Sequence, residues 1–157
     1  MRIFVTSLCV VGLTVAAAAQ QKAETLPPPG YDAALAQKLG ADDYGMKPYV
    51  LVILKTGPKT DAPPAERQKA FSGHMANIQR LAKENKLALA GPMMKNDKGY
   101  QGIFIFNVPT IKEAEELVAT DPAVAGGFLS FEFFGWYGTA ALPEVLPLHA
   151  RIEKKSH

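Results

Sequence analysis

The sequence predicts an α+β domain in which one antiparallel sheet carries two helices on one face. Three observations support this fold class. Short runs rich in β-branched and aromatic residues have the composition of strands, a long segment has apolar residues at helical spacing, and a shorter helical segment has a capping signal. Along the chain these segments follow the order strand, helix, strand, strand, helix, strand.

The N-terminal segment is expected to be removed from the mature protein. Met1-Arg2 supplies a positive charge, the run 3–15 is mostly apolar, and Ala17-Ala18-Ala19 fits the A-x-A cleavage rule. The apolar run is shorter than the ~20 residues that a membrane span needs. Residues 1–19 therefore predict a secretory signal peptide and a periplasmic or secreted protein, with no membrane association after cleavage. A retained N-terminal anchor is the alternative.

Composition excludes several kinds of function. Cys9 is the only cysteine and lies in the signal segment, so the mature chain is expected to have no disulfide and no thiolate nucleophile or ligand. The formal charge of +2 falls to about +1 without Arg2, which favours neither nucleic acid nor an anionic membrane surface. No serine-hydrolase, zinc-protease, phosphate-loop or EF-hand motif is present, and we expect no metal.

Four segments are expected to be strands. The first is apolar throughout, which predicts burial on both faces. Gly91-Pro92 is expected to end the second strand, and Asn96–Gly99 has hairpin-turn chemistry. The expected strands are Tyr49–Leu54, Leu87–Ala90, Gly102–Val108 and Phe128–Trp136.

Two helices are expected between the strands. The longer, Ala65–Asn85, follows Pro63-Pro64, a position where the fixed φ of proline is tolerated. The shorter, Ile111–Ala119, has Thr110 as its N-cap and Glu113 at the position that completes a capping box. Asp121-Pro122 is expected to open a further helical turn.

Two segments lie outside the domain that these strands and helices form, one before it and one after it. Residues 20–48 predict a proline-containing linker and a short docking helix, Tyr31–Leu39, with Gly40 as its C-cap. Residues 143–157 predict a polar tail after the domain at 49–142. The order of elements in the domain matches the ferredoxin-like split βαβ arrangement. Its second sheet face would be apolar and uncovered, which predicts a homodimer.

His74 is the most informative residue of the chain. In the longer helix it shares one face with apolar residues, at the positions Phe71, Met75, Ile78, Leu81 and Ala82. A buried imidazole needs a hydrogen-bond partner, because its absence costs about 1–3 kcal/mol. Asp121 is the best candidate. The alternatives are a core histidine bonded to a backbone carbonyl, and an aspartate that only caps the following helical turn.

Five further residues are weaker candidates for a substrate pocket. Gly91 and Pro92 are otherwise a strand terminator, Met93 an ordinary core residue, and Glu132 part of a solvated edge beside Trp136. The histidines of the tail, His149 and His157, lack metal-ligand spacing.

From Tyr49 to Tyr137 the chain resembles the YCII-related (YciI-like) family of the dimeric α/β-barrel superfamily. The fragments that carry the resemblance are Tyr49–Leu54, His74 with Ile78-Gln79-Arg80-Leu81-Ala82, Leu87–Pro92, Glu113-Ala114 and Asp121–Gly126. The resemblance implies that His74 and Asp121 are the active-site pair. It also implies chemistry without metal or organic cofactor on small aromatic or lactone-like compounds. One YCII-like member that resembles this pattern is a dehydrochlorinase of a chlorinated hydroxyhydroquinone.

The sequence therefore predicts an exported, cofactor-free enzyme that uses His74 and Asp121 for proton abstraction from a small cyclic or aromatic compound. Isomerisation, elimination and lyase reactions all belong to this class. Two alternatives remain open: a small-molecule-binding or stress-related module of the same fold, and a structural accessory domain.

Overall fold

The computed structural model describes residues 28–155. The predicted signal peptide and the linker as far as residue 27 lie outside the described residues. From Asp32 onward the described residues form one compact unit, which contains every helix and strand discussed below.

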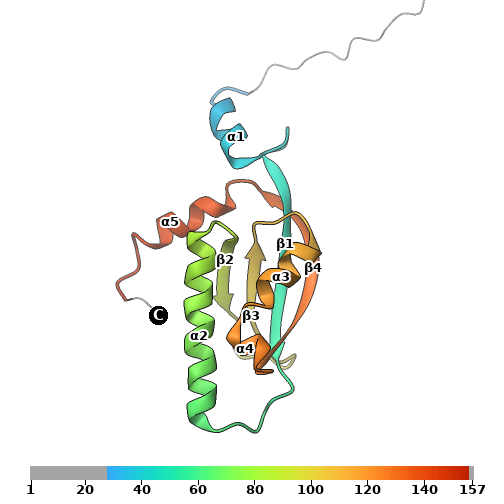
Figure 1. Cartoon of the computed structure of the whole chain (residues 1–157). Helices are drawn as coiled ribbons and strands as arrows, with labels where there is room; N and C mark the ends of the chain where they lie inside the picture. Colours follow the sequence, from blue (N-terminus) through green and yellow to red (C-terminus); the bar gives the residue numbers. More distant parts are fainter. Residues whose placement is uncertain (1–27, 156–157) are drawn as a thin grey trace, which may run out of the picture. The chain divides into compact units, whose positions relative to one another are not determined.

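This unit contains the strand, helix, strand, strand, helix, strand order that the sequence predicts, with additions at both ends (Figure 1). A short helix precedes the first strand, one helical turn precedes the last strand, and two short helical segments follow it. The elements are α1 (Ala33–Leu39), β1 (Met46–Thr56), α2 (Pro64–Lys83), β2 (Leu87–Pro92), β3 (Tyr100–Phe106), α3 (Ile111–Val118), α4 (Pro122–Ala125), β4 (Leu129–Thr139), the 3-10 helix η1 (Leu142–Glu144) and α5 (Val145–His149).

The sheet has the strand order β2-β3-β1-β4, and every neighbouring pair is antiparallel. In β1, which is paired on both sides, Leu51 lies opposite Ile105 of β3 and Phe134 of β4. This order, with helices inserted after β1 and β3, is the ferredoxin-like arrangement. The predicted fold class is therefore confirmed.

Strand boundaries differ from the prediction where backbone pairing continues beyond the apolar run. β1 and β4 pair from Met46–Thr139 to Thr56–Leu129, so both strands are longer than expected. Gly91 and Pro92 do not terminate β2 after Ala90 but are its last two residues, because Gly91 pairs with Ile103 and Pro92 with Gly102. Proline is tolerated there because β2 is an edge strand.

The helix termini follow the predicted capping chemistry in most details. Gly40 ends α1 in the left-handed conformation, with φ of 70°. The Thr110 hydroxyl caps α3 by accepting a hydrogen bond from the Glu113 amide at 3.3 Å. The Glu113 carboxylate accepts from that hydroxyl at 2.8 Å and not from the Thr110 amide, so only half of the capping box forms.

One face of the sheet packs against the helices and holds the larger core. Side chains that alternate along β1 and β3 contribute to it, together with residues of α2 and α3. The buried positions of α2 are Ala70, His74, Asn77 and Leu81, whereas Phe71, Met75, Ile78 and Ala82 are only partly buried. The predicted stripe is thus turned by about one position, and a polar residue, Asn77, lies in its centre.

The opposite face of the sheet, here called the outer face, has a smaller buried cluster formed by Tyr49, Ala88 and Ile105. Leu142 of η1 packs against this cluster, so the segment after β4 covers the end of the face near β2. The predicted polar tail thus begins with a helical segment. The rest of the outer face is apolar and partly open; its exposed aromatic residues are Phe134 and Trp136, at 45% and 36% exposure.

We predict a pH-dependent contribution from the contact between Tyr137 and Asp42. The Tyr137 hydroxyl donates to the Asp42 carboxylate, and this hydrogen bond, with that from the Met46 amide, holds the pKa of Asp42 below 3.8. A lowered carboxyl pKa stabilises the fold above the unfolded value and loses that effect as the pH falls through the folded pKa. Tyr137→Phe should therefore lower the melting temperature at pH 7, and the difference from wild type should shrink below pH 3.8. Thermal unfolding followed by circular dichroism measures this; a difference that stays constant with pH would contradict it.

Candidate functional site

His74 lies where α2 crosses the helix-covered face of the sheet. Its ring stacks on Phe104 of β3, with ring centroids 5.8 Å apart and planes inclined by 25°. The edge of Phe71 approaches from the preceding turn of α2, with centroids 5.9 Å apart. These two aromatic rings fix the plane of the imidazole. His74 as a whole is 9% exposed.

Asp121 reaches the same place from the loop between α3 and α4. It is the N-cap of α4: its Oδ1 accepts a hydrogen bond from the Ala123 amide at 2.9 Å, and Pro122 occupies the first helical position. Its Oδ2 lies 2.6 Å from Nδ1 of His74, and the carboxylate is buried. The predicted pairing of His74 with Asp121 is therefore present, and the capping role coexists with it because each carboxylate oxygen has its own partner.

Gly73 allows α4 to approach α2 closely enough for this contact. A Cβ atom at Gly73 would lie 2.8 Å from Cγ of Pro122, which is closer than atoms pack in proteins. A glycine inside a helix costs about 0.5–1 kcal/mol relative to alanine, so its presence next to His74 indicates a packing requirement. A glycine inside a predicted helix is a sequence signal of a close neighbouring segment. This signal was not used in the prediction.

The hydrogen-bond pattern assigns the tautomer of His74. A carboxylate only accepts hydrogen bonds, so Nδ1 carries the proton and donates it to Asp121. Nε2 is then the ring atom with a free lone pair. Within residues 28–155 no side chain or backbone group is hydrogen-bonded to Nε2, and the His74 side chain is 11% exposed. This arrangement is that of an oriented imidazole base.

A polar network lies one turn along α2 from His74 and was missed by the sequence analysis. Asn77, which is 7% exposed, accepts a hydrogen bond from Arg80, and Arg80 also donates to Thr120, the residue before Asp121. Ile78 was expected on the buried face of α2, and its neighbour Asn77 was not. The only signal for these contacts is a polar residue three positions after His74.

The structure does not bring the other predicted pocket residues to His74. Glu132 and Trp136 pair with Ile53 and Tyr49 of β1, whose side chains lie on the outer face. Glu132 forms an ion pair with Lys55 at 2.6 Å, and the Trp136 ring lies 5.6 Å from that of Tyr49. The sequence showed that these residues alternate but could not show which set faces the helices.

Gly91, Pro92 and Met93 lie in or directly after the edge strand β2. Gly91 is paired with a residue of the outer face, and Pro92 and Met93 are exposed. Among the described residues, no hydrogen bond or ring contact joins these three to His74.

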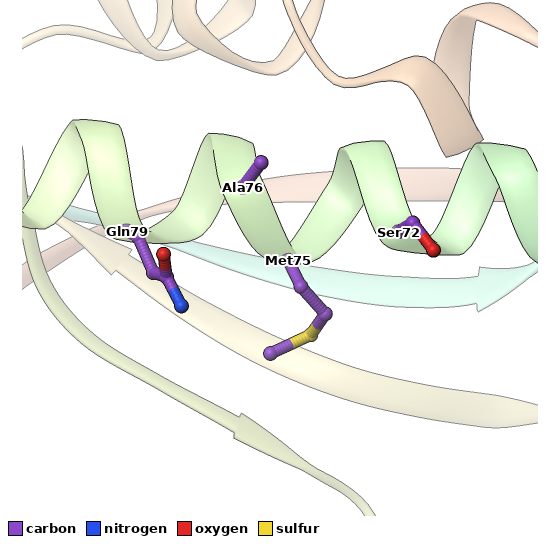
Figure 2. A pocket seen from close by; sticks show the side chains of 4 residues that line it. All are labelled: Ser72, Met75, Ala76 and Gln79. Carbon is purple, nitrogen blue, oxygen red and sulfur yellow. The ribbon is translucent and has the colours of Figure 1, made fainter. Parts of the chain in front are cut away.

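Two shallow hollows, each of about 310 Å³, lie outside this pair. Figure 2 shows the first, where side chains of α2 line it: Ser72, Met75, Ala76 and Gln79. The second lies beside α3 and is lined by Lys86, Val108, Glu113, Glu116 and Leu117. Neither lining includes His74 or Asp121, so neither hollow by itself defines a substrate site.

Residues 28–155 contain no group of three or more histidine, cysteine, aspartate or glutamate side chains placed to hold a metal ion. No helix in this part of the chain is both long and apolar enough to cross a membrane.

Comparison with protein families matches residues 48–136, more than half of the chain, to the YCII-related domain. No curated protein matches the chain. Two solved structures are similar in part. One is 5-chloro-2-hydroxyhydroquinone dehydrochlorinase from Burkholderia phenoliruptrix in complex with 2,5-dihydroxybenzoquinone, with 20% identity, a TM-score of 0.39, and coverage of 55% of this chain and 92% of that chain. The other is a dimeric protein of unknown function and ferredoxin-like fold from Bacteroides fragilis, with 16% identity, a TM-score of 0.41, and coverage of 59% and 95%.

We predict that Asp121 contributes more to stability than capping alone explains. Asp121→Ala removes the cap and leaves the buried Nδ1–H of His74 without an acceptor, so the free energy of unfolding should fall by about 2–4 kcal/mol. Asp32 is a matched control, because it caps α1 through the Leu35 amide but is exposed. Asp32→Ala should cost about 1 kcal/mol or less. Urea unfolding measures both values, and equal losses would show that the contact with His74 adds nothing.

Proposed function

This chain belongs to the YCII-related family, and from that premise we propose that it is an enzyme that abstracts a proton from a small cyclic or aromatic compound. His74 is the proposed general base and Asp121 the residue that orients it. The observation that carries the proposal is the 2.6 Å contact between Nδ1 and a buried carboxylate, which leaves Nε2 without a partner in the described structure.

The proposed mechanism uses only this chain's own side chains. Nε2 accepts a proton from a phenolic hydroxyl or from a carbon next to a carbonyl, while Nδ1 continues to donate to Asp121. The imidazolium that forms lies against the carboxylate, so its charge is compensated in a site with little water. Positioned proton transfer of this kind accelerates reactions by about 10²–10⁴-fold. The proposed reaction needs no metal or organic cofactor.

The surroundings of His74 support an aromatic or otherwise flat substrate. Phe71 is partly buried, stands edge-on to the imidazole, and lies 6.3 Å from the ring of Phe128. Aromatic rings pack favourably against such edges and faces. We propose that the substrate ring contacts Phe71 when its acidic proton is at Nε2.

A binding function is the second candidate, and the burial of His74 favours it. An enzyme needs a substrate atom within hydrogen-bond distance of Nε2, yet the His74 side chain is only 11% exposed and neither hollow includes it. A small-molecule-binding or stress-related module would use the same fold without turnover. The two candidates differ in what His74→Ala changes: turnover in an enzyme, and at most affinity in a binding module.

We propose that the protein acts outside the cytoplasm as a homodimer. The predicted signal peptide supports export, and the open part of the outer face supports association with a second copy. This part consists of Leu51, Ile53, Ile103, Phe134 and Trp136. A stable dimer buries about 800 Å² on each partner, and an apolar sheet face is a suitable surface for it.

We predict that the chain exchanges carbon-bound hydrogen of suitable probes with solvent. The mature protein in D₂O should incorporate deuterium into members of a panel of hydroxylated quinones, chlorinated hydroquinols, cyclic ketones and lactones, as followed by mass spectrometry. His74→Ala should slow this by about 10²–10⁴-fold because the base is lost. His149→Ala is the matched control, since His149 is exposed on α5, and it should leave the rate unchanged. Equal rates in wild type and His74→Ala would reject His74 as the base.

We predict that the mature protein sediments as a dimer at micromolar concentration. Phe134→Glu places a charge in the open part of the outer face and should give a monomer, because burying an unpaired carboxylate is costly. Tyr44→Glu is the control: Tyr44 is 85% exposed and lies outside the sheet, so the dimer should persist. Sedimentation velocity distinguishes these results, and a monomeric wild type would contradict the homodimer.

A further inference from the structure

A second connection joins α2 to the loop that carries Asp121, one helical turn from the His74–Asp121 contact. Its centre is the Arg80 side chain: Nη2 lies 2.7 Å from Oδ1 of Asn77 and 2.9 Å from Oγ1 of Thr120. Nη1 lies 3.0 and 2.9 Å from the two carboxylate oxygens of Glu84. Arg80 and Thr120 are 40 residues apart in the sequence. The network is therefore a tertiary contact and not only a surface ion pair within one helix.

The hydrogens of Arg80 and Thr120 match the acceptor oxygens around them. The Thr120 hydroxyl has one hydrogen and two acceptors within reach, the Leu117 carbonyl at 2.6 Å and Oδ1 of Asn77 at 3.1 Å. It donates to the nearer one, the Leu117 carbonyl. Its oxygen is then free to accept from Arg80. The two hydrogens on Nη2 serve the two oxygens, one of Asn77 and one of Thr120. Only a planar guanidinium supplies both bonds and a paired contact with Glu84 at once.

This network acts on the segment that carries Asp121. Thr120 directly precedes Asp121, and Asn77 lies three residues after His74 on the buried side of α2. The amides of Thr120 and Asp121 donate to carbonyls of Leu117 and Val118, so the loop backbone is bonded to α3. The contacts that tie the loop to α2 are the Arg80 network, the packing of Pro122 on Gly73, and the His74–Asp121 contact itself.

We propose that Arg80, Asn77 and Thr120 are positioning residues that hold the Asp121 carboxylate on Nδ1 of His74. The pair would otherwise depend on one hydrogen bond across a tertiary contact, and a shift of the loop by an ångström would break it. The network therefore keeps the proton on Nδ1 and the lone pair on Nε2. Its consequence for turnover rests on the proposed function, whereas its effect on the tautomer does not.

The glutamate of the network provides an internal control. Arg80 and Glu84 are exposed and one turn apart, and such ion pairs contribute little to stability. Thr120 and Asn77 link the arginine to the second segment. Glu84→Gln should therefore leave the His74–Asp121 contact intact, although it removes the only full charge partner of Arg80 in the network.

The experiment measures the His74 Nδ1 proton by NMR in the mature protein with ¹⁵N-labelled histidine. In Thr120→Val and in Arg80→Gln, we expect this proton to exchange with water at least about 5-fold faster, as loss of one hydrogen bond implies. A mixture of ring tautomers should appear in the ¹⁵N shifts. Thr120→Ser keeps the hydroxyl and should restore the wild-type spectrum. Arg80→Gln changes an exposed side chain, so it provides the test if Thr120→Val fails to fold.

Thr110→Val is the matched control for stability. Thr110 caps the first turn of α3, so this is the same substitution at the opposite end of the helix that precedes Thr120. It should lower the free energy of unfolding without changing the His74 proton. If Thr120→Val and Arg80→Gln leave the exchange rate and tautomer at their wild-type values, the network is only structural and the proposal is overturned. A changed His74 signal in a protein that turns over no probe would contradict the proposed function and support the positioning role.

Discussion

The contact between His74 and Asp121 joins two parts of the chain that are 47 residues apart, and much of the local structure is arranged to permit it. A buried carboxylate is unfavourable unless its oxygens are paired, and here one oxygen accepts from the α4 backbone and the other from the imidazole. Gly73 allows the close approach of α4, and Phe104 supports the ring from the sheet. Helix α2, the α3–α4 loop and the sheet must therefore all be in place before the pair can form.

The two faces of the sheet have different roles. Side chains on the helix-covered face build the core and the His74–Asp121 pair, while those on the outer face form an apolar surface that the segment after β4 covers only in part. Because successive residues of a strand point to opposite faces, β1 contributes to both. A one-residue change in the register of β4 against β1 would place Glu132 and Trp136 beside the helices. The same change in β3 would remove Phe104 from His74. The pairing of β1 with both neighbours thus fixes the site as well as the core.

Local chemistry explains how much of the fold could be predicted. The Thr110 cap, the left-handed Gly40 and the Asp121-Pro122 turn are encoded within a few residues, and each was predicted where it occurs. Errors occur where pairing with a distant strand decides the outcome. Pro92 reads as a stop signal but is accommodated at an edge strand, and the position of an element in a sheet is not a local property.

The same distinction applies to the site. The sequence by itself determined the fold class, the buried helix face with one imidazole, and Asp121 as its best partner, because period, chain order and capping are readable along the chain. Only the tertiary structure decided which oxygen of Asp121 meets which nitrogen of His74, and that Arg80 connects Asn77 to Thr120. It also decided that Glu132 lies on the far side of the sheet. These facts depend on distances between segments far apart in sequence, which strand register and helix packing set together.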